Sequence, residues 1–275
     1  MRRRRPSAGR TSDGPVGVFD SGIGGLTVLD AISRRMPAES LVYFGDTAHV
    51  PYGTKSPEAV ARYSSEVARY LEGLGVKALV VACNTASAVA LPTVRRAVGV
   101  PVIGVILPGA KAAAEASRSG RIGIIGTEAT IASGAYTRAV KGLRPKARVT
   151  GAACPLFVPF VEEGWWDGSV IEAVARRYLG TMRRSGVDTL ILGCTHYPLL
   201  RGVVAAEMGK AVTLIDSAEQ TAIELWALLR RLGLERTSGK GKARFIVSDG
   251  PGRFRMLARR LIGKDVDVRR HRFDG

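Results

Sequence analysis

Several features are missing from this 275-residue sequence, and each absence argues against a class of protein. Its most apolar stretches, residues 76–83 and 101–110, are far shorter than the ~20 residues that a membrane-spanning helix needs. It has three cysteines, an odd number that does not make a disulfide framework. No apolar run follows Arg2–Arg5, so a secretory signal is not expected. We therefore expect a cytoplasmic protein without a membrane partner, whose thiols stay reduced and free for chemistry.

The sequence also lacks the motifs that hold common cofactors. The glycine-rich turn at residues 20–25 (Asp-Ser-Gly-Ile-Gly-Gly) has neither the Gly-x-Gly-x-x-Gly spacing of a dinucleotide site nor the Gly-Lys-Ser/Thr of a P-loop. No group of His, Cys and Asp has the spacing of metal ligands. We expect neither a cofactor nor a metal.

The sequence has fewer acidic than basic residues. There are 24 Asp and Glu against 41 Lys and Arg, which gives a formal net charge of +17. Much of the excess lies in Arg2–Arg5 and between Arg253 and Arg272. We interpret it as a solvated, arginine-rich surface. The alternative is a regulator that binds nucleic acid or a protein through its basic tails, although no nucleic-acid-binding motif accompanies the charge.

Short β-branched runs alternate with longer helical patterns along the chain. The runs are apolar throughout, which is typical of a parallel sheet covered by helices on both faces. This pattern predicts an α/β fold whose active-site residues follow the carboxyl ends of the strands. Strands are expected at 16–19, 41–44, 78–82, 102–105, 122–125, 148–152, 189–192, 212–215 and 243–247, and helices at 25–35, 57–73, 87–97, 110–117, 170–185, 197–207 and 218–232.

Two pairs of segments resemble each other. Residues 79–85 (Leu-Val-Val-Ala-Cys-Asn-Thr) and 190–196 (Leu-Ile-Leu-Gly-Cys-Thr-His) are both apolar strands that end in a small residue, a cysteine and two polar residues. Residues 16–21 match residues 122–127, and the two offsets are similar (194 − 83 = 111 and 127 − 21 = 106). A duplicated lobe explains both pairs.

The duplication predicts two pseudo-symmetric domains, each a mostly parallel sheet flanked by helices, with the active site in the cleft between them. We expect a disordered basic tail over residues 1–14. The first lobe is expected to span 15–107 plus 216–275, and the second 108–215. The chain would cross between them at Pro108-Gly109 and return at Asp216-Ser217.

Cys83 and Cys194 each follow an expected strand and precede a helical pattern. At a helix N-terminus, free N–H groups and the helix dipole favour an anion, which lowers a thiol's pKa from about 8.5. The alternative for either residue is a buried structural cysteine. Matching polar residues after both favour reactive thiols, whereas Cys154 has no polar neighbour and is expected in the core.

Four other positions carry candidate chemistry. Asp20, in the glycine-rich turn, could bind an ammonium group or assist a thiol. The turn at 51–53 (Pro-Tyr-Gly) could aim a ring or an amide inward, or it could be a plain surface turn. His196 is the histidine with a polar, motif-like setting, and Glu162 or Glu163 could be a proton partner for His196 or Cys194.

Taken in order, these segments resemble the glutamate racemases of the aspartate/glutamate racemase superfamily. The resemblance runs from about residue 16 to the final helix, and the arginine-rich tail lies outside the family pattern. Five motifs carry it: Phe-Asp-Ser-Gly-Ile-Gly-Gly (19–25), Gly-Asp with Pro-Tyr-Gly (45–46 and 51–53), Ala-Cys-Asn-Thr-Ala-Ser (82–87), Val-Pro-Phe-Val-Glu (158–162) and Gly-Cys-Thr-His-Tyr-Pro (193–198).

The resemblance implies two α/β domains around a cleft, no pyridoxal phosphate, and interconversion of L- and D-glutamate that supplies D-glutamate for peptidoglycan. It implies that Cys83 removes the α-proton of D-glutamate and Cys194 that of L-glutamate, with Asp20, Glu162 and His196 assisting. The adjacent Glu163 leaves the assisting carboxylate uncertain by one position. The residues implied to bind substrate are Asp20, Ser21, Tyr52, Gly53, Asn84, Thr85, Thr195 and His196. Aspartate racemase of the same superfamily is the alternative, and we also expect a homodimer.

Overall fold

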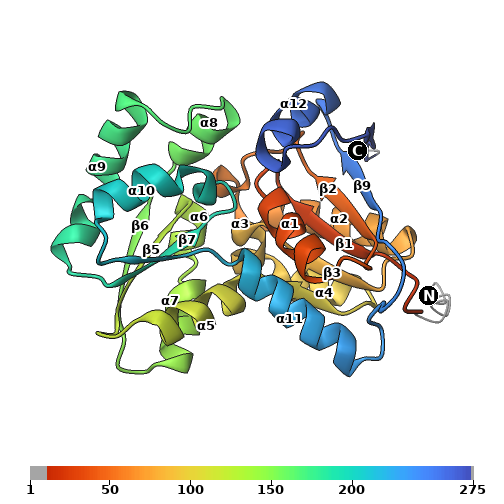
Figure 1. Ribbon diagram of the computed structural model, residues 1–275, viewed down its shortest axis with the longest axis horizontal. Helices are drawn as coiled ribbons and strands as arrows, with labels where there is room; N and C mark the ends of the chain where they lie inside the picture. Colours follow the sequence, from red (N-terminus) through yellow and green to blue (C-terminus); the bar gives the residue numbers. More distant parts are fainter. Residues whose placement is uncertain (1–10, 274–275) are drawn as a thin grey trace.

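Two parallel sheets organise the chain, whose residues 11–273 are described by a computed structural model (Figure 1). The first sheet has the strand order β10-β9-β2-β1-β3-β4 and the second has the order β6-β5-β7-β8. Helices flank both sheets, so the predicted α/β class is confirmed. The strands are β1 (Val16–Asp20), β2 (Leu41–Gly45), β3 (Ala78–Val81), β4 (Val102–Gly104), β5 (Arg121–Gly126), β6 (Arg148–Ala153), β7 (Thr189–Gly193), β8 (Thr213–Ile215), β9 (Ala243–Val247) and β10 (Val268–Arg270).

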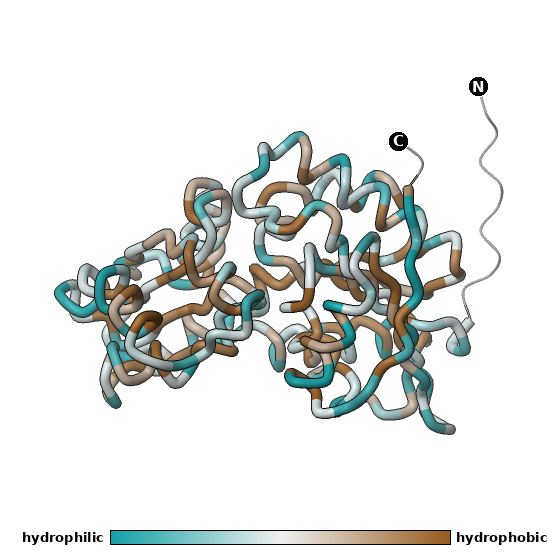
Figure 2. Tube along the Cα trace, turned by 90° about the horizontal axis from the view of Figure 1, so that it is seen from above, coloured by the Kyte–Doolittle hydropathy of each residue, from teal (hydrophilic) through white to brown (hydrophobic). Residues whose placement is uncertain are grey.

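The central strands are apolar because both of their faces are covered. β1, β2, β3 and β7 are buried along their whole length, as expected for parallel strands between two layers of helices. Each sheet therefore has a hydrophobic cluster on either face. Figure 2 shows apolar segments in the middle of both halves and hydrophilic ones at the periphery. None of the helices within residues 11–273 combines the length and the apolar character needed to cross a membrane.

The helices follow the predicted pattern with two differences. The expected helix over 87–97 is divided in two at Ala90, because Pro92 has no N–H to donate and its ring clashes with the preceding turn. The sequence analysis also did not predict the short helices that follow β5 and β6, or the helix over 251–262 and the strand over 268–270. The helices are α1 (Leu26–Arg35), α2 (Pro57–Gly73), α3 (Asn84–Val89), α4 (Leu91–Ala97), α5 (Ile106–Ala116), α6 (Glu128–Ala132), α7 (Ala135–Leu143), α8 (Phe157–Glu162), α9 (Ser169–Arg184), α10 (Arg201–Met208), α11 (Ala218–Arg231) and α12 (Pro251–Ile262), with the 3₁₀ turns η1 (Tyr52–Thr54) and η2 (Tyr197–Leu200).

The chain passes between the two sheets through α5 and α11. The predicted crossing at Pro108-Gly109 lies inside the first turn of α5, where a proline is tolerated because that N–H has no partner in the helix. The return at Asp216-Ser217 lies between β8 and α11. The C-terminal segment adds β9, α12 and β10 to the first sheet. The residues at which the two lobes divide stay a prediction.

Ten residues of the predicted N-terminal tail, 1–10, lie outside the described residues. We expected residues 11–14 to be disordered, but they form a turn in which the Gly14 N–H donates to the Thr11 carbonyl. The ammonium of Lys77 donates to the Ser12 carbonyl at 2.7 Å. This contact fastens the turn to the beginning of β3.

Lys77 also forms a buried ion pair with Glu39. Its Nζ lies 2.6 Å from Glu39 Oε2, and the two side chains are 1 % and 0 % exposed. Glu39 Oε1 accepts the Arg236 N–H at 2.7 Å. The pair therefore joins the N-terminal turn, the start of β2 and the loop before β9.

We expect Lys77→Met to destabilise the fold by about 3–5 kcal/mol, because it leaves the Glu39 carboxylate buried without its cation. Lys111→Met is the matched control, since Lys111 pairs with Glu224 at 3.1 Å with both side chains exposed. That change should cost about 0–1 kcal/mol. Urea unfolding measures both. Equal losses in the two variants would contradict the structural role of the buried pair.

Candidate active site

The carboxyl ends of the central strands bring the predicted residues together. β3 ends two residues before Cys83 and β7 ends just before Cys194, and the two strands pair with β1 and β5 in the interior of their sheets. The two cysteines, one from each sheet, border one cavity. Its other lining residues are Ser21, Pro51, Tyr52, Gly53, Asn84, Thr85, Thr127, Val158, Thr195 and His196.

This cavity is nearly closed. Its volume is about 10 Å³, which is about the minimum that holds one water molecule. The lobes press against each other here: a side-chain carbon at Gly24 would lie 2.4 Å from Thr195 Oγ1, and one at Gly53 would lie 2.5 Å from Thr127 Cβ. Glycines are therefore required at both positions when the cleft is closed.

Cys83 begins α3 as its N-cap residue. Its Sγ accepts the Ala86 N–H at 3.5 Å and donates to Ser21 Oγ at 3.8 Å. Burial, together with the nearby Asp20 carboxylate, nevertheless raises the pKa of the Cys83 thiol to about 12. The N–H of Ala86 at the helix N-terminus acts to lower this pKa as predicted, but it does not offset the loss of water around a thiolate, so the predicted net lowering is wrong.

Cys194 has a different partner, the imidazole of His196. The Cys194 Sγ lies 3.7 Å from His196 Nδ1, and His196 Nε2 lies 2.7 Å from Glu162 Oε1. Burial acts to lower the pKa of His196, but its hydrogen bonds to Cys194 and Glu162 outweigh burial and raise that pKa well above about 6.5. The same contact lowers the pKa of Glu162 in spite of its burial. The contact with the Glu162 carboxylate therefore favours a protonated His196 beside the Cys194 sulfur.

Asp20 is fully buried at the end of β1 and reaches the other lobe. Its Oδ2 accepts the Gly22 N–H at 3.0 Å, and its Oδ1 accepts the Thr195 hydroxyl at 3.2 Å. Burial raises the pKa of Asp20, although the positive charge of His196 acts against this shift. A buried carboxyl with a raised pKa can hold a proton beside the cavity.

Tyr52 lines the cavity, but its hydroxyl is engaged elsewhere. It donates to Asp46 Oδ2 at 2.6 Å. Asp46 also accepts the Ser248 hydroxyl at 2.8 Å and lies 2.9 Å from His49 Nδ1. Asp46 therefore anchors the turn at 51–53, which faces the cleft rather than being a plain surface turn.

Polar side chains of α3 contact the second lobe. Asn84 Nδ2 donates to the Tyr136 hydroxyl at 2.7 Å, while Asn84 Oδ1 is buried with no protein partner. Thr85 Oγ1 lies 2.9 Å from Thr127 Oγ1 and 3.1 Å from Thr130 Oγ1. A buried oxygen without a partner at the cavity is available to a ligand.

The sequence analysis did not single out Thr127, Thr130 or Tyr136. A signal for Thr127 was present, because the match of residues 122–127 to 16–21 makes it the counterpart of Ser21. Tyr136 lies within α7 and had no such signal. Glu163, the alternative to Glu162, is exposed and pairs with Arg253 at 2.8 Å. Cys154 is buried in the core of the second lobe as predicted.

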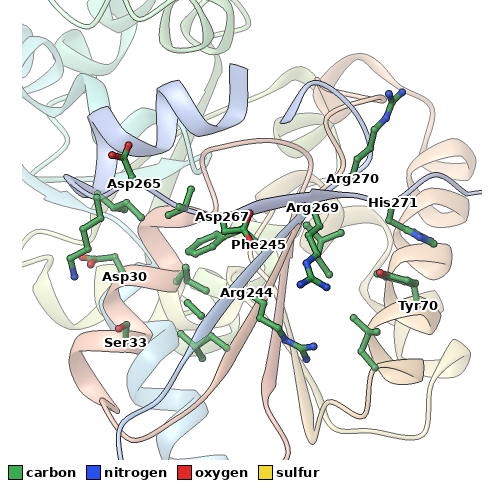
Figure 3. Close-up of a pocket in the computed structure, with 18 residues that line it drawn as sticks. Asp30, Ser33, Tyr70, Arg244, Phe245, Asp265, Asp267, Arg269, Arg270 and His271 are labelled. Carbon is green, nitrogen blue, oxygen red and sulfur yellow. The ribbon is translucent and has the colours of Figure 1, made fainter. Parts of the chain in front are cut away.

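A larger cavity of about 490 Å³ lies at the β9–β10 edge of the first sheet. Figure 3 shows its labelled residues, with Asp30 and Asp265 on one side and Arg244 and Arg269 on the other. No cysteine is among its lining residues. Within residues 11–273, no three His, Cys, Asp or Glu side chains gather as metal ligands. Two thiols, one after a strand of each sheet, that border the same small cavity suit the removal of a proton from a carbon and the return of a proton to it.

Comparisons with known proteins agree with this geometry. The model of the Asp/Glu/hydantoin racemase family matches residues 17–225. A glutamate racemase of Geobacter metallireducens is 53 % identical over 249 residues, which cover 90 % of this chain and 92 % of that protein. A glutamate racemase isoform of Bacillus anthracis has a TM-score of 0.91 at 41 % identity, with 96 % and 98 % of the two chains covered. The structure of a Francisella tularensis glutamate racemase with D-glutamate has a TM-score of 0.89 at 36 % identity, covering 96 % and 98 %.

The charge state of His196 depends on Glu162 and not on Glu163. We expect Glu162→Gln to lower the pKa of His196, because it removes the anion that favours the imidazolium. Because this pKa is raised in the folded chain, the stability that it contributes is complete below about pH 6.5 and is lost as the pH rises through the folded-state value. Nitrogen-15 NMR titration can follow the three histidines of the chain. Glu163→Gln is the matched control, and an equal shift in both variants would contradict this arrangement.

Proposed function

The chain belongs to the Asp/Glu/hydantoin racemase family, and we propose that it interconverts L- and D-glutamate with Cys83 and Cys194 as the two bases. The observation that carries this proposal is that the two thiols, one from each sheet, border the same enclosed cavity. Racemisation needs a base on one face of the α-carbon and an acid on the other.

Glutamate as the substrate is supported by the relatives, which are named as glutamate racemases, and by polar groups at the cavity. Asn84 Oδ1, buried without a partner, can accept a hydrogen bond from the substrate ammonium. The hydroxyls of Thr85, Thr127 and Thr195, which bond across the cleft to partners in the other lobe when it is closed, can donate to the substrate carboxylates once the lobes have separated. Because the cavity of about 10 Å³ holds no amino acid, we infer that the lobes separate to admit the substrate.

The two thiols start in different protonation states under this proposal. The raised pKa keeps Cys83 as a thiol, while the His196 imidazolium 3.7 Å from Cys194 Sγ stabilises a thiolate there. The Cys194 thiolate takes the α-proton, and the electron pair of the broken C–H bond stays on the α-carbon. Cys83 then gives its proton to the opposite face and becomes the thiolate. By the family pattern, this direction converts L-glutamate to D-glutamate.

The carbanion has no iminium electron sink, so the protein must stabilise it by hydrogen bonds to the carboxylate and by exclusion of water. The closed cleft supports this role, since its walls leave room for about one water molecule. After turnover Cys194 carries the proton and Cys83 is the thiolate, and the pair regains its starting state when solvent takes the proton from Cys194 and returns one to Cys83. Asp20 lies near Cys83 and His196 lies beside Cys194. Glu162 orients His196 and maintains its charge.

We propose that the D-glutamate serves peptidoglycan synthesis in the cytoplasm. A homodimer and contact with nucleic acid through the basic tails stay predictions. Residues 1–10, which carry most of the N-terminal arginines, lie outside the described residues. A steep fall of nucleic-acid affinity with salt, lost on deletion of these residues, would be the expected sign of such contact.

We expect Cys83→Ala and Cys194→Ala each to lower the rate of racemisation by about 10²–10⁴-fold, the range for loss of a general acid or base. Cys154→Ala, at a buried cysteine away from the cavity, is the matched control. Circular dichroism follows the reaction from both enantiomers, and D₂O reports exchange of the α-proton. Residual exchange in a single-cysteine variant should retain configuration.

Near-native racemisation by either variant would overturn the two-base scheme. L- and D-aspartate are assayed in parallel. Faster turnover of aspartate than of glutamate would favour the alternative substrate within the same family.

A further inference from the structure

Figure 1 shows α12 and α8 next to each other where the two halves of the chain meet. Two arginines of α12 bond to residues at and just after the end of α8. Arg253 Nη2 donates to the Glu162 carbonyl at 2.9 Å and to Glu163 Oε1 at 2.8 Å. Arg260 Nη1 donates to the Gly164 carbonyl at 2.7 Å. The seven-residue spacing of the arginines puts them on one face of α12. These bonds join a helix packed on the first sheet to a helix packed on the second.

Arg260 makes a second contact with the same segment. Its guanidinium carbon lies 4.1 Å from the centre of the Trp166 ring, a cation–π arrangement. Gly164 has a φ of +77°, and a side-chain carbon there would lie 2.5 Å from Arg260 Nη1. The turn after α8 is thus shaped to receive the Arg260 guanidinium.

The segment held by these arginines is the one that carries Glu162. The backbone carbonyl of Glu162 accepts from Arg253 while its side chain holds His196 Nε2 at 2.7 Å. His196 in turn lies 3.7 Å from Cys194 Sγ. α8 has only six residues, and carbonyls at a helix end favour a cation. Arg253 therefore supports the Glu162 backbone on which the orientation of His196 depends.

A cavity of about 380 Å³ lies between α8 and α12. Arg253 and Glu162 both line it, and it shares Pro51 and Val158 with the cavity at the two cysteines. A substrate that enters between α8 and α12 must pass the arginine contacts. Those contacts are at the rim, where the Arg253 and Glu163 side chains are 54 % and 63 % exposed, so each bond is weak enough to break and re-form.

We propose that Arg253 and Arg260 are positioning residues that latch α8 to α12 in the closed cleft, so that Glu162 holds His196 in place beside Cys194. The latch opens when the lobes separate and closes again over the bound substrate. This inference rests on the proposed function for its effect on turnover. Its effect on His196 does not depend on which substrate the enzyme uses.

The test compares Arg260→Ala, Arg253→Ala and the double variant with Arg259→Ala. Arg259 is the matched control, because it lies on the same helix and its carboxylate partner is Asp265, just after that helix. We expect kcat to fall about 2–5-fold in each single latch variant, the effect of losing weak, exposed contacts, with a larger fall in the double variant. Arg260→Lys keeps the charge but not the planar fork, so it should recover only part of the activity.

The second readout is the nitrogen-15 NMR titration of His196. A loosened Glu162 should lower the pKa of His196 in the latch variants and leave it unchanged in Arg259→Ala, with the same melting temperature in all of them. The latch is wrong if wild-type protein racemises glutamate while the latch variants match Arg259→Ala in kcat and in the His196 titration. If the wild-type protein does not racemise glutamate, the proposed function fails, and the His196 titration still decides whether the latch exists.

Discussion

The hydrogen bond between His196 and Glu162 is the interaction on which the rest of the site depends. It is 2.7 Å long, and the two side chains are 2 % and 19 % exposed. An isolated charge in such a place would be costly, so each partner keeps its charge because of the other. The pair gives Cys194 a positive neighbour in a medium of low dielectric, where that charge has most effect. Moving Glu162 out of this position would therefore change the electrostatic environment of the Cys194 sulfur, to which Glu162 is linked through His196.

The two thiols occupy equivalent places in a duplicated fold but differ in their electrostatic partners. The difference begins two residues after each cysteine. In the first lobe that residue is Thr85, which bonds to the Thr127 hydroxyl across the cleft; in the second lobe it is His196. Cys83 instead lies near the carboxyl group of Asp20, and burial raises the pKa of both groups. Under the proposed function, the symmetry of the strands places the two bases, and the departure from symmetry determines which of them starts with the proton.

The sequence was sufficient to predict most of the parallel strands and the matching settings of Cys83 and Cys194, because each follows from a short local pattern. Most of the cavity lining was implied by the resemblance to the glutamate racemases. The pKa of Cys83 was mispredicted, since the adjacent helix end is visible in the sequence and the loss of water is not. The sequence could not decide between Glu162 and Glu163, because the choice depends on the direction in which each side chain points at the end of a short helix. The contact of Arg253 with α8 joins residues that are 91 positions apart in the sequence, and no periodic pattern of the sequence predicts a contact over such a separation.

The arginine-rich C-terminal segment shows how net charge can mislead. In the sequence it indicates a solvated surface or a polyanion partner, yet Arg253 and Arg260 are bound to carbonyls of the other lobe. Arginine suits these positions better than lysine, because one planar group can meet a carbonyl and a carboxylate together, as at Arg253, or a carbonyl and an aromatic face, as at Arg260. Part of the excess charge thus serves to hold two lobes together around a buried ion pair. The total of +17 is therefore a weaker argument for a nucleic-acid partner than the sequence alone suggests.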